Sequence, residues 1–236
     1  MHRNNEPNMK LNTAFKAIKY LLWDNDGVLV DTEQFYFASG QQVLEENGIP
    51  LTMAQFREIS LEQGQSVFDM AADYGISDAR RHAMRQERDR LYSAYLQSEN
   101  ILIPGAREVV ATCAAHFRMC IVSSSMKNNF YEIHARTGNL LSYFEFHLLN
   151  GDYPRSKPHP DPWLTAMSRF NASPKQCLVI EDSPRGIQAA TAAGMAVVAV
   201  ASRFFNEQAL LPHLTLSDHC ISSIRDLPEL LGQTFS

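Results

Sequence analysis

Two aspartates stand two residues apart behind an apolar run near the start of the chain. The segment YLLWDNDGVLVDTE, residues 20–33, places Asp24 and Asp26 at the point where the sequence turns from apolar to acidic. Crowded carboxylates repel one another and raise each other's pKa, so a buried strand that ends in them needs a compensating positive charge. Mg²⁺ prefers oxygen ligands of this kind, and an aspartate carboxylate can be the covalent nucleophile in phosphoryl transfer. Alone the segment is a weak signal, because acidic pairs often cap helices or turns, but it is compatible with metal-assisted chemistry on a phosphate group.

Further polar groups end later apolar runs or lie between them. They are Ser123 and Ser124, Lys157 in SKPHPD, and Glu181 with Asp182. Each motif alone is typical of a helix cap or a turn. In a doubly wound sheet, however, the site forms at the carboxyl ends of the strands, so these groups are expected to converge. Their occurrence in this order, behind successive buried runs, favours a catalytic site over capping.

The carboxylates supply an expected Mg²⁺ site. Asp24 and Asp182 are the expected carboxylate ligands, because Mg²⁺ keeps several waters and needs only one or two carboxylates beside a substrate phosphate. The backbone carbonyl of Asp26 is a plausible third ligand, and Glu181 could act through a water molecule.

The remaining roles follow from the chemistry of phosphoryl transfer. Asp24 is expected to attack phosphorus, and Asp26 to protonate the leaving oxygen and later deprotonate the attacking water. Asp26 reaches the site only if a turn at Gly27 swings it over the end of the strand. Ser123 could donate a hydrogen bond to a phosphoryl oxygen, and Lys157 could neutralise phosphoryl charge and restrain Asp24.

The elements that must position these groups alternate between short strands and helices. Apolar runs of five or six residues are typical of strands buried on both faces of a parallel sheet, and helix-length segments lie between them. This alternation predicts an α/β fold with a Rossmann-like, doubly wound parallel sheet. The expected strands are residues 18–23, 118–123, 176–181 and 195–200.

Residues 33–103 break this rhythm, because they contain no convincing strand and several helix-length segments. They are expected to form a helical cap inserted into a core made of residues 18–32 and 104–236. Residues 1–17 are expected to form a flexible tail, since the segment is polar and lacks the apolar core of a signal peptide.

Polar residues of the expected cap are candidate substrate contacts. Gln63, Gln65 and Ser66 are uncharged donors and acceptors suited to sugar or polyol hydroxyls, although a polar turn explains them equally well. Tyr36 is a further candidate, for which a packing role is the competing interpretation. Residues 77–97 carry five arginines among acidic residues and are expected to present a solvated helix face.

Composition excludes several classes of protein. The 236 residues are 45% hydrophobic, which suffices for a sizeable core, and the net charge of −5 argues against a nucleic-acid-binding protein. No apolar run approaches the roughly 18–20 residues of a membrane span. The four cysteines match no metal or redox motif and are expected to be buried reduced thiols, which predicts a cytoplasmic protein. No surplus amphipathic surface indicates an interface, so a monomer is expected.

Taken in order, WDNDGVLVDTE, IVSSS, SKPHPD and VIEDSPRGIQAATAAGM resemble the four motifs of the haloacid dehalogenase superfamily of phosphohydrolases. The resemblance is to the branch similar to β-phosphoglucomutase and covers about residues 18–230, cap included.

Position by position, the resemblance implies the roles argued above. It makes Asp24 the nucleophile, Asp26 the general acid and base, and Asp182 a Mg²⁺ ligand with Glu181 beside it. It implies that Ser123 and Lys157 contact the phosphate group and Asp24. It also implies that the protein acts on a small phosphorylated metabolite. The residue between the aspartates is often aliphatic or aromatic in the family, whereas here it is Asn25. Its backbone N–H would still face the phosphate, so its side chain is expected to have little consequence.

Within the superfamily, a phosphatase is the favoured interpretation. Dehalogenases lack the second aspartate, whereas Asp26 is present here. Mutases of the β-phosphoglucomutase type resemble this chain at every core motif but carry a cap histidine and a cap arginine, for which Tyr36 and Val67 stand here. A sugar phosphomutase stays the alternative, and a non-catalytic binding protein is a third interpretation that the intact motif set disfavours.

Overall fold

A computed structural model describes residues 15–98, 100–215 and 218–233 of the chain. The described residues divide into two compact units, one formed by those up to residue 30 and from residue 102 onward, and the other by those between 31 and 101. We call them the core and the helical unit. The boundaries lie within two residues of those expected for core and cap. The expected tail, residues 1–17, falls largely outside the described residues.

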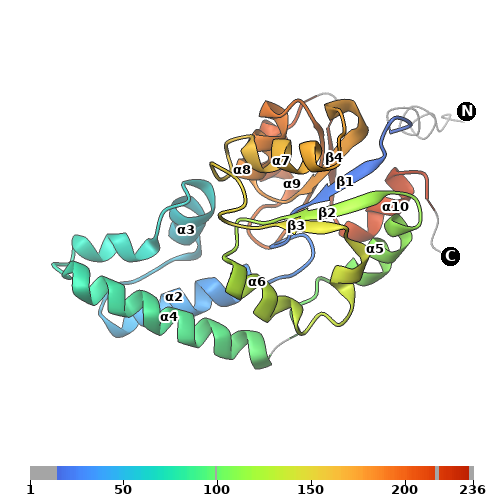
Figure 1. The fold of residues 1–236 in the computed structure, drawn as a ribbon. Helices are drawn as coiled ribbons and strands as arrows, with labels where there is room; N and C mark the ends of the chain where they lie inside the picture. The colour runs from blue at the N-terminus through green and yellow to red at the C-terminus, as the bar shows by residue number, and fades with distance from the viewer. Residues whose placement is uncertain (1–14, 99, 216–217, 234–236) are drawn as a thin grey trace, which may run out of the picture. The chain divides into compact units, whose positions relative to one another are not determined.

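The core contains a six-stranded parallel sheet in the order β3-β2-β1-β4-β5-β6 (Figure 1). All of its described strand pairs are parallel, which confirms the predicted doubly wound fold. Strand β1 pairs with β2 on one side and with β4 on the other, so that Trp23 lies beside Ile121 and Ile180. The strands are β1 (Tyr20–Trp23), β2 (Arg118–Val122), β3 (Phe146–Leu148), β4 (Cys177–Glu181), β5 (Ala196–Val200) and β6 (His219–Ile221).

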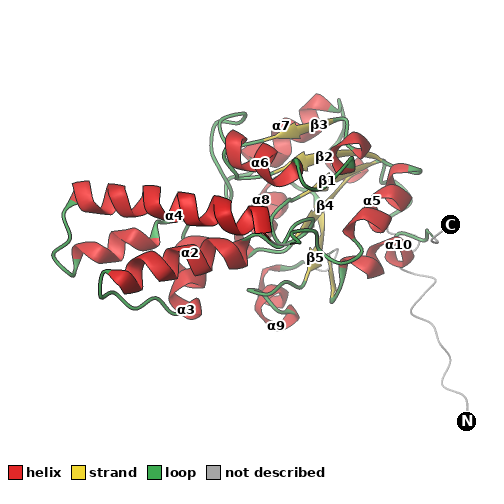
Figure 2. Ribbon diagram, turned by 90° about the horizontal axis from the view of Figure 1, so that it is seen from below, coloured by secondary structure: helices red, strands yellow, loops and turns green. Residues whose placement is uncertain are grey.

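Helices cover both faces of this sheet. Helices α5, α6 and α10 lie on one face, and α7 and α8 on the other (Figures 1 and 2). Helix α8 begins directly after Ser183, because the Ser183 side chain accepts a hydrogen bond from the Gly186 N–H and a proline occupies the first turn. The core helices are α5 (Ala106–Ala114), α6 (Lys127–His134), α7 (Asp161–Arg169), α8 (Pro184–Ala192), α9 (Glu207–Leu210) and α10 (Leu227–Leu230). Short 3₁₀ helices span Leu140–Tyr143, Pro174–Gln176, Leu211–His213 and Ile224–Asp226.

The described residues of the helical unit form helices joined by loops and include no strand. Its longest pair, α2 and α4, pack against each other, and a capping box between Thr52 and Gln55 begins α3. Its elements are α2 (Glu33–Glu46), α3 (Met53–Phe56), a π-helix (Arg57–Glu62), a 3₁₀ helix (Val67–Ala72) and α4 (Asp78–Ser98).

The prediction that the arginines of α4 lie on a solvated face is wrong for Arg88, which is buried. Its guanidinium lies 4.1 Å from the ring centroid of Tyr36 and donates to Asp89 at 2.8 Å. A guanidinium can be buried in this way because it stacks on an aromatic face while keeping an anionic partner.

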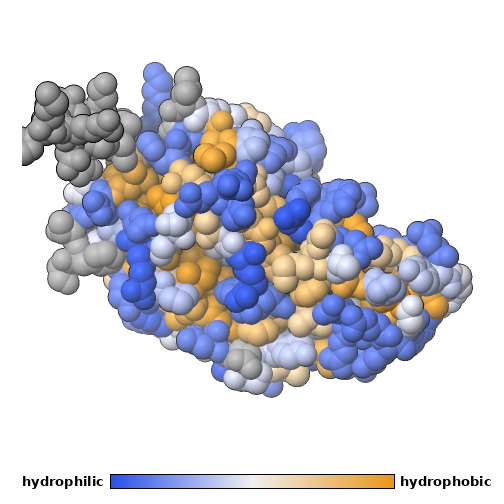
Figure 3. Space-filling model, turned by 180° about the vertical axis from the view of Figure 1, so that it is seen from behind, coloured by the Kyte–Doolittle hydropathy of each residue, from blue (hydrophilic) through white to orange (hydrophobic). Residues whose placement is uncertain are grey.

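The edge strands β3 and β6 were not expected, because three residues give too short a pattern to read. All four cysteines are free thiols, as expected, but Cys220 is half-buried rather than buried like the other three. A cytoplasmic location and a monomeric state stay predictions. None of the helices in the described residues combines the length and the apolar character needed to cross a membrane. Hydrophilic side chains cover much of the face shown in Figure 3, with smaller hydrophobic areas between them.

Candidate active site

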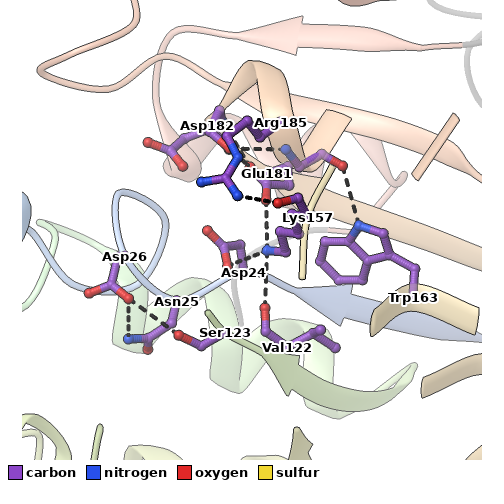
Figure 4. Close-up of polar contacts among 12 residues, drawn as sticks. Asp24, Asn25, Asp26, Val122, Ser123, Lys157, Trp163, Glu181, Asp182 and Arg185 are labelled. Atoms are coloured by element: carbon purple, nitrogen blue, oxygen red, sulfur yellow. Dashed lines mark hydrogen bonds and ion pairs between the residues drawn. The ribbon is translucent and has the colours of Figure 1, made fainter. Parts of the chain in front are cut away.

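A buried ion-pair cluster lies at the carboxyl ends of β1, β2 and β4, and Lys157 is at its centre (Figure 4). The Lys157 ammonium donates to Asp24 Oδ1 at 2.6 Å, to Glu181 Oε1 at 2.8 Å and to the Val122 carbonyl at 3.2 Å. It also lies 4.4 Å from the ring centroid of Trp163. The lysine is only 4% exposed. It therefore joins three strand ends that are more than 20 residues from it in the chain.

Glu181 holds the loop that follows β4. Its Oε2 accepts hydrogen bonds from the backbone N–H groups of Asp182 and Ser183, both at 2.8 Å, and from the Ser183 hydroxyl at 2.9 Å. A Cβ atom on Gly186 would lie 1.6 Å from Glu181 Oε1, so only glycine leaves room for this carboxylate. These contacts give Glu181 a structural role in addition to the water-mediated metal contact expected for it.

Burial and like charge set the protonation of the cluster. Burial and the neighbouring Glu181 carboxylate raise the pKa of Asp24 to about 7, although Lys157 opposes the shift. Burial alone would lower the pKa of Lys157, but Asp24 and Glu181 outweigh it and hold that pKa above its usual value. The lysine is therefore charged at neutral pH, and a further cation would be needed to hold Asp24 fully ionised.

The carboxylates fit a divalent cation. Ligand oxygens of Asp24, Glu181 and Asp182 lie within 4.8 Å of one another, and all three residues are buried. Gly27 permits this approach, because its φ of +81° favours glycine and a Cβ there would lie 2.0 Å from Asp182 Oδ2. An oxygen-only donor set of this spacing suits a hard cation such as Mg²⁺.

The turn expected at Gly27 is present, since the Gly27 N–H donates to the Val30 carbonyl at 2.8 Å. It places the Asp26 carboxylate beside the end of β2. There Oδ2 of Asp26 accepts from the Ser123 hydroxyl at 3.3 Å and from the Ser125 hydroxyl at 2.9 Å. Of the two predicted serines, Ser123 thus joins the site, whereas Ser124 is exposed. Ser125 was missed, because nothing in the run SSS distinguishes its members.

The Asn25 side chain has contacts that the sequence interpretation did not foresee. Asn25 is fully buried; its Nδ2 donates to Asp26 Oδ2 at 3.3 Å, and its Oδ1 lies 2.8 Å from His134 Nε2. Burial lowers the pKa of His134 to about 4, so the ring is neutral at pH 7. The expectation of little consequence at position 25 rested on the backbone alone. His134 was missed because it lies 109 residues along the chain.

The candidate residues of the helical unit lie on or near its surface. Gln63 and Gln65 are exposed, and Ser66 caps the 3₁₀ helix and accepts from Arg85 Nε at 3.3 Å. Tyr36 is half-buried, with its ring centroid 5.4 Å from that of Tyr92. The packing explains Tyr36 without a ligand, and contacts of these four residues with substrate stay predictions.

Comparison with known proteins gives a family match and a set of relatives. Residues 21–200 match the family described as haloacid dehalogenase-like hydrolase. A probable pseudouridine-5'-phosphatase of Drosophila melanogaster is 29% identical over 80% of this chain and 84% of its own. A 6-phosphogluconate phosphatase of Escherichia coli (strain K12) is 28% identical over 90% and 94%. The fold is similar to that of CbbY from Rhodobacter sphaeroides, solved with xylulose-(1,5)bisphosphate, at a TM-score of 0.72 and 17% identity over 89% and 96%.

Proposed function

The chain belongs to the haloacid dehalogenase-like hydrolase family as a phosphoric monoester hydrolase, and we propose that it is a Mg²⁺-dependent phosphatase that works through an aspartyl-phosphate on Asp24. The observation that carries the proposal is the cluster around Lys157. One ammonium holds Asp24 at 2.6 Å and Glu181 at 2.8 Å, beside a third carboxylate within 4.8 Å. This arrangement is costly unless an additional cation and a phosphate complete it.

The first half of the proposed reaction transfers the phosphoryl group. Lys157 fixes Oδ1 of Asp24, so we assign Oδ2 as the atom that attacks phosphorus. A bond forms between Asp24 and phosphorus while the bond to the ester oxygen breaks, and Asp26 gives its proton to that leaving oxygen. The backbone N–H of Asn25 and the Ser123 hydroxyl would donate to phosphoryl oxygens.

The second half restores the enzyme. Asp26, now ionised, takes a proton from a water molecule that attacks the same phosphorus atom, which releases inorganic phosphate and frees the Asp24 carboxylate. Bound Mg²⁺ would supply charge neutralisation between Asp24 and the phosphoryl oxygens, held by the carboxylates of Asp24 and Asp182 and the carbonyl of Asp26. Lys157 keeps Asp24 in position throughout, because both of its carboxylate partners are buried with it.

The proposed substrate is a small sugar or polyol phosphate. The names of the two relatives denote phosphomonoesters of sugar-derived compounds, pseudouridine 5'-phosphate and 6-phosphogluconate. We propose that the helical unit is a cap and that Gln63, Gln65 and Ser66 bind substrate hydroxyls. The unit is inserted right after the turn that carries Asp26, and the two connecting segments pair, with a bridge between Val30 and Leu102.

The test is phosphate release from a panel of phosphomonoesters, with Mg²⁺ and with EDTA. The panel contains 6-phosphogluconate, pseudouridine 5'-phosphate, glycerol 3-phosphate, glucose 6-phosphate and p-nitrophenyl phosphate. We expect metal-dependent release that Asp24→Asn abolishes and that Asp78→Asn, on the exposed start of α4, leaves unchanged. Release that survives Asp24→Asn would contradict the assigned nucleophile. An isomerised product that depends on a bisphosphate activator would favour the mutase instead.

A further inference from the structure

Four buried or half-buried side chains of the core form a continuous hydrogen-bonded chain that ends on Asp26. His134 Nδ1 lies 3.0 Å from Thr137 Oγ1, and His134 Nε2 lies 2.8 Å from Asn25 Oδ1. Asn25 Nδ2 then lies 3.3 Å from Asp26 Oδ2. Asn25 and Thr137 are fully buried, and His134 is 3% exposed. The chain thus connects the end of α6 to the carboxylate proposed as the general acid and base.

The chemistry of the carboxylate fixes the direction of these hydrogen bonds. Oδ2 of Asp26 accepts from Ser123 and Ser125, and it still accepts when Asp26 carries its proton on Oδ1. The amide of Asn25 must therefore present its NH₂ group to Asp26 and its carbonyl oxygen to His134. Because the His134 ring is neutral, it donates from Nε2 and accepts at Nδ1 from the Thr137 hydroxyl at 3.0 Å. The His134 carbonyl, at 3.1 Å, is the other acceptor within reach of that one hydroxyl proton. Every group in the chain then has a partner of the correct kind.

Packing alone does not account for this arrangement. An amide buried in a core must give up water, and its hydrogen bonds return little net stability, so a hydrophobic side chain would fill position 25 at least as well. The hydrogen-bonded series also does more than supply hydrogen-bond partners for the Asn25 amide. Asn25, Ser123 and Ser125 all donate to the same oxygen of Asp26, Oδ2, from two different strand ends. Three donors on one oxygen hold a carboxylate in one orientation.

We propose that His134 is a positioning residue, which acts through Asn25 to hold the carboxylate of Asp26 in the orientation from which it serves the leaving oxygen. The inference rests on the proposed function, since it takes Asp26 as the general acid. His134 itself touches neither substrate nor metal ligand in this account. Its removal would leave Asp26 chemically intact but would release Asn25, one of the three donors that orient Oδ2, and misplacement of a catalytic group by about 1 Å can cost on the order of 100-fold in rate.

The leaving group distinguishes this role from a structural one. An alkoxide leaving group needs the proton of Asp26, whereas p-nitrophenolate leaves without one. The measurement is kcat/KM, because it reports the steps up to the first phosphoryl transfer. For His134→Leu we expect kcat/KM to fall roughly 10- to 100-fold with the alkyl phosphate that the wild type hydrolyses fastest. With p-nitrophenyl phosphate we expect a fall below about threefold.

Two further variants separate positioning from folding. His134→Gln can place an N–H near the position of Nε2, so it should recover most of the alkyl phosphate activity. The pair Asn25→Leu and His134→Leu replaces both buried partners by apolar groups, which can restore stability but not the hydrogen bond. We expect this double variant to regain melting temperature over His134→Leu without regaining alkyl phosphate hydrolysis. Asp26→Ala is the reference, with the largest selective loss.

Each outcome decides the inference. Equal losses on both substrates, no loss on either, or recovery of alkyl phosphate activity by the apolar pair would overturn it and leave His134 a core residue. If His134→Leu does not fold, Asn25→Leu carries the same comparison of leaving groups, since its backbone is unchanged. If Asp26→Ala does not lose alkyl phosphate hydrolysis selectively, the proposed general acid is overturned and this inference with it. If Asp26→Ala shows the expected selective loss but His134→Leu does not, the inference alone is overturned.

Discussion

Replacing Lys157 by methionine tests the electrostatic reasoning most strongly, because one buried ammonium compensates two buried carboxylates. The side chains of Lys157, Asp24 and Glu181 are 5%, 12% and 1% exposed, with N···O distances of 2.6 and 2.8 Å. Breaking a buried ion pair by removing one partner costs about 3–5 kcal/mol. For a chain of this length, 1 kcal/mol shifts the melting temperature by roughly 2–4 °C, so Lys157→Met should lower it by roughly 6–20 °C.

The assay is thermal unfolding of the metal-free protein at pH 7.5. Arg155→Met is the matched control, since Arg155 is 59% exposed and pairs with Asp161 at 2.8 Å; an exposed pair contributes little. Adding Glu181→Gln to Lys157→Met should recover part of the loss, because it removes one of the uncompensated charges while keeping an oxygen for its other donors. A fall for Lys157→Met no larger than that of the control would refute the idea that this ammonium compensates the buried carboxyl groups of Asp24 and Glu181.

Three further predictions concern the same cluster. Gly27→Ala should destabilise the protein and abolish activity in unfolding and turnover assays, since the new Cβ would lie 2.0 Å from Asp182 Oδ2. The control in the same assays is Gly48→Ala, where φ is +75° and a Cβ would meet no atom within 4 Å. Gly48→Ala should lower the free energy of unfolding by only about 1–2 kcal/mol. Because the pKa of Asp24 is raised from 3.8 to about 7, the folded metal-free protein binds this proton more tightly than the unfolded chain, and its stability should fall as pH rises from about 4 to about 7. Melting curves in EDTA should therefore show Asp24→Asn without this slope and more stable than the wild type at pH 8. Asp182→Asn should raise the Mg²⁺ concentration for half-maximal turnover about tenfold or more, as a metal titration of activity will show.

The sequence predicted the sheet because its central strands are unusually uniform. All residues of CLVIE in β4 are buried, and such runs bounded by turn residues leave few alternatives. The edge strands β3 and β6 were missed for the opposite reason, since each has three residues and half-exposed positions. Helix-length segments were predicted between the strands, and an N-cap such as Ser183 marks where a helix begins. The four-residue helices α9 and α10 were not predicted.

The candidate site could be predicted as far as it depends on strand ends. The convergence of Asp24, Lys157 and Glu181 was expected because parallel strands end at the same edge of a sheet, whereas the order of the strands was not predicted. Contacts made by side chains from helices do not follow from any local pattern. His134 lies in an ordinary helical segment, and only the packing of α6 against the sheet brings it 2.8 Å from Asn25. The burial of Arg88 was unpredictable for the same reason, since it depends on the ring of Tyr36.

The covalent intermediate on Asp24 is the central claim, and one measurement tests it directly. Asp26→Ala should form the aspartyl-phosphate from p-nitrophenyl phosphate and hydrolyse it slowly, because the leaving group needs no acid but the water needs a base. Acid quenching during turnover, borohydride reduction of the acyl phosphate and mass spectrometry should then reveal homoserine at position 24. Phosphate release with position 24 unmodified, or a modification at another residue, would contradict the account.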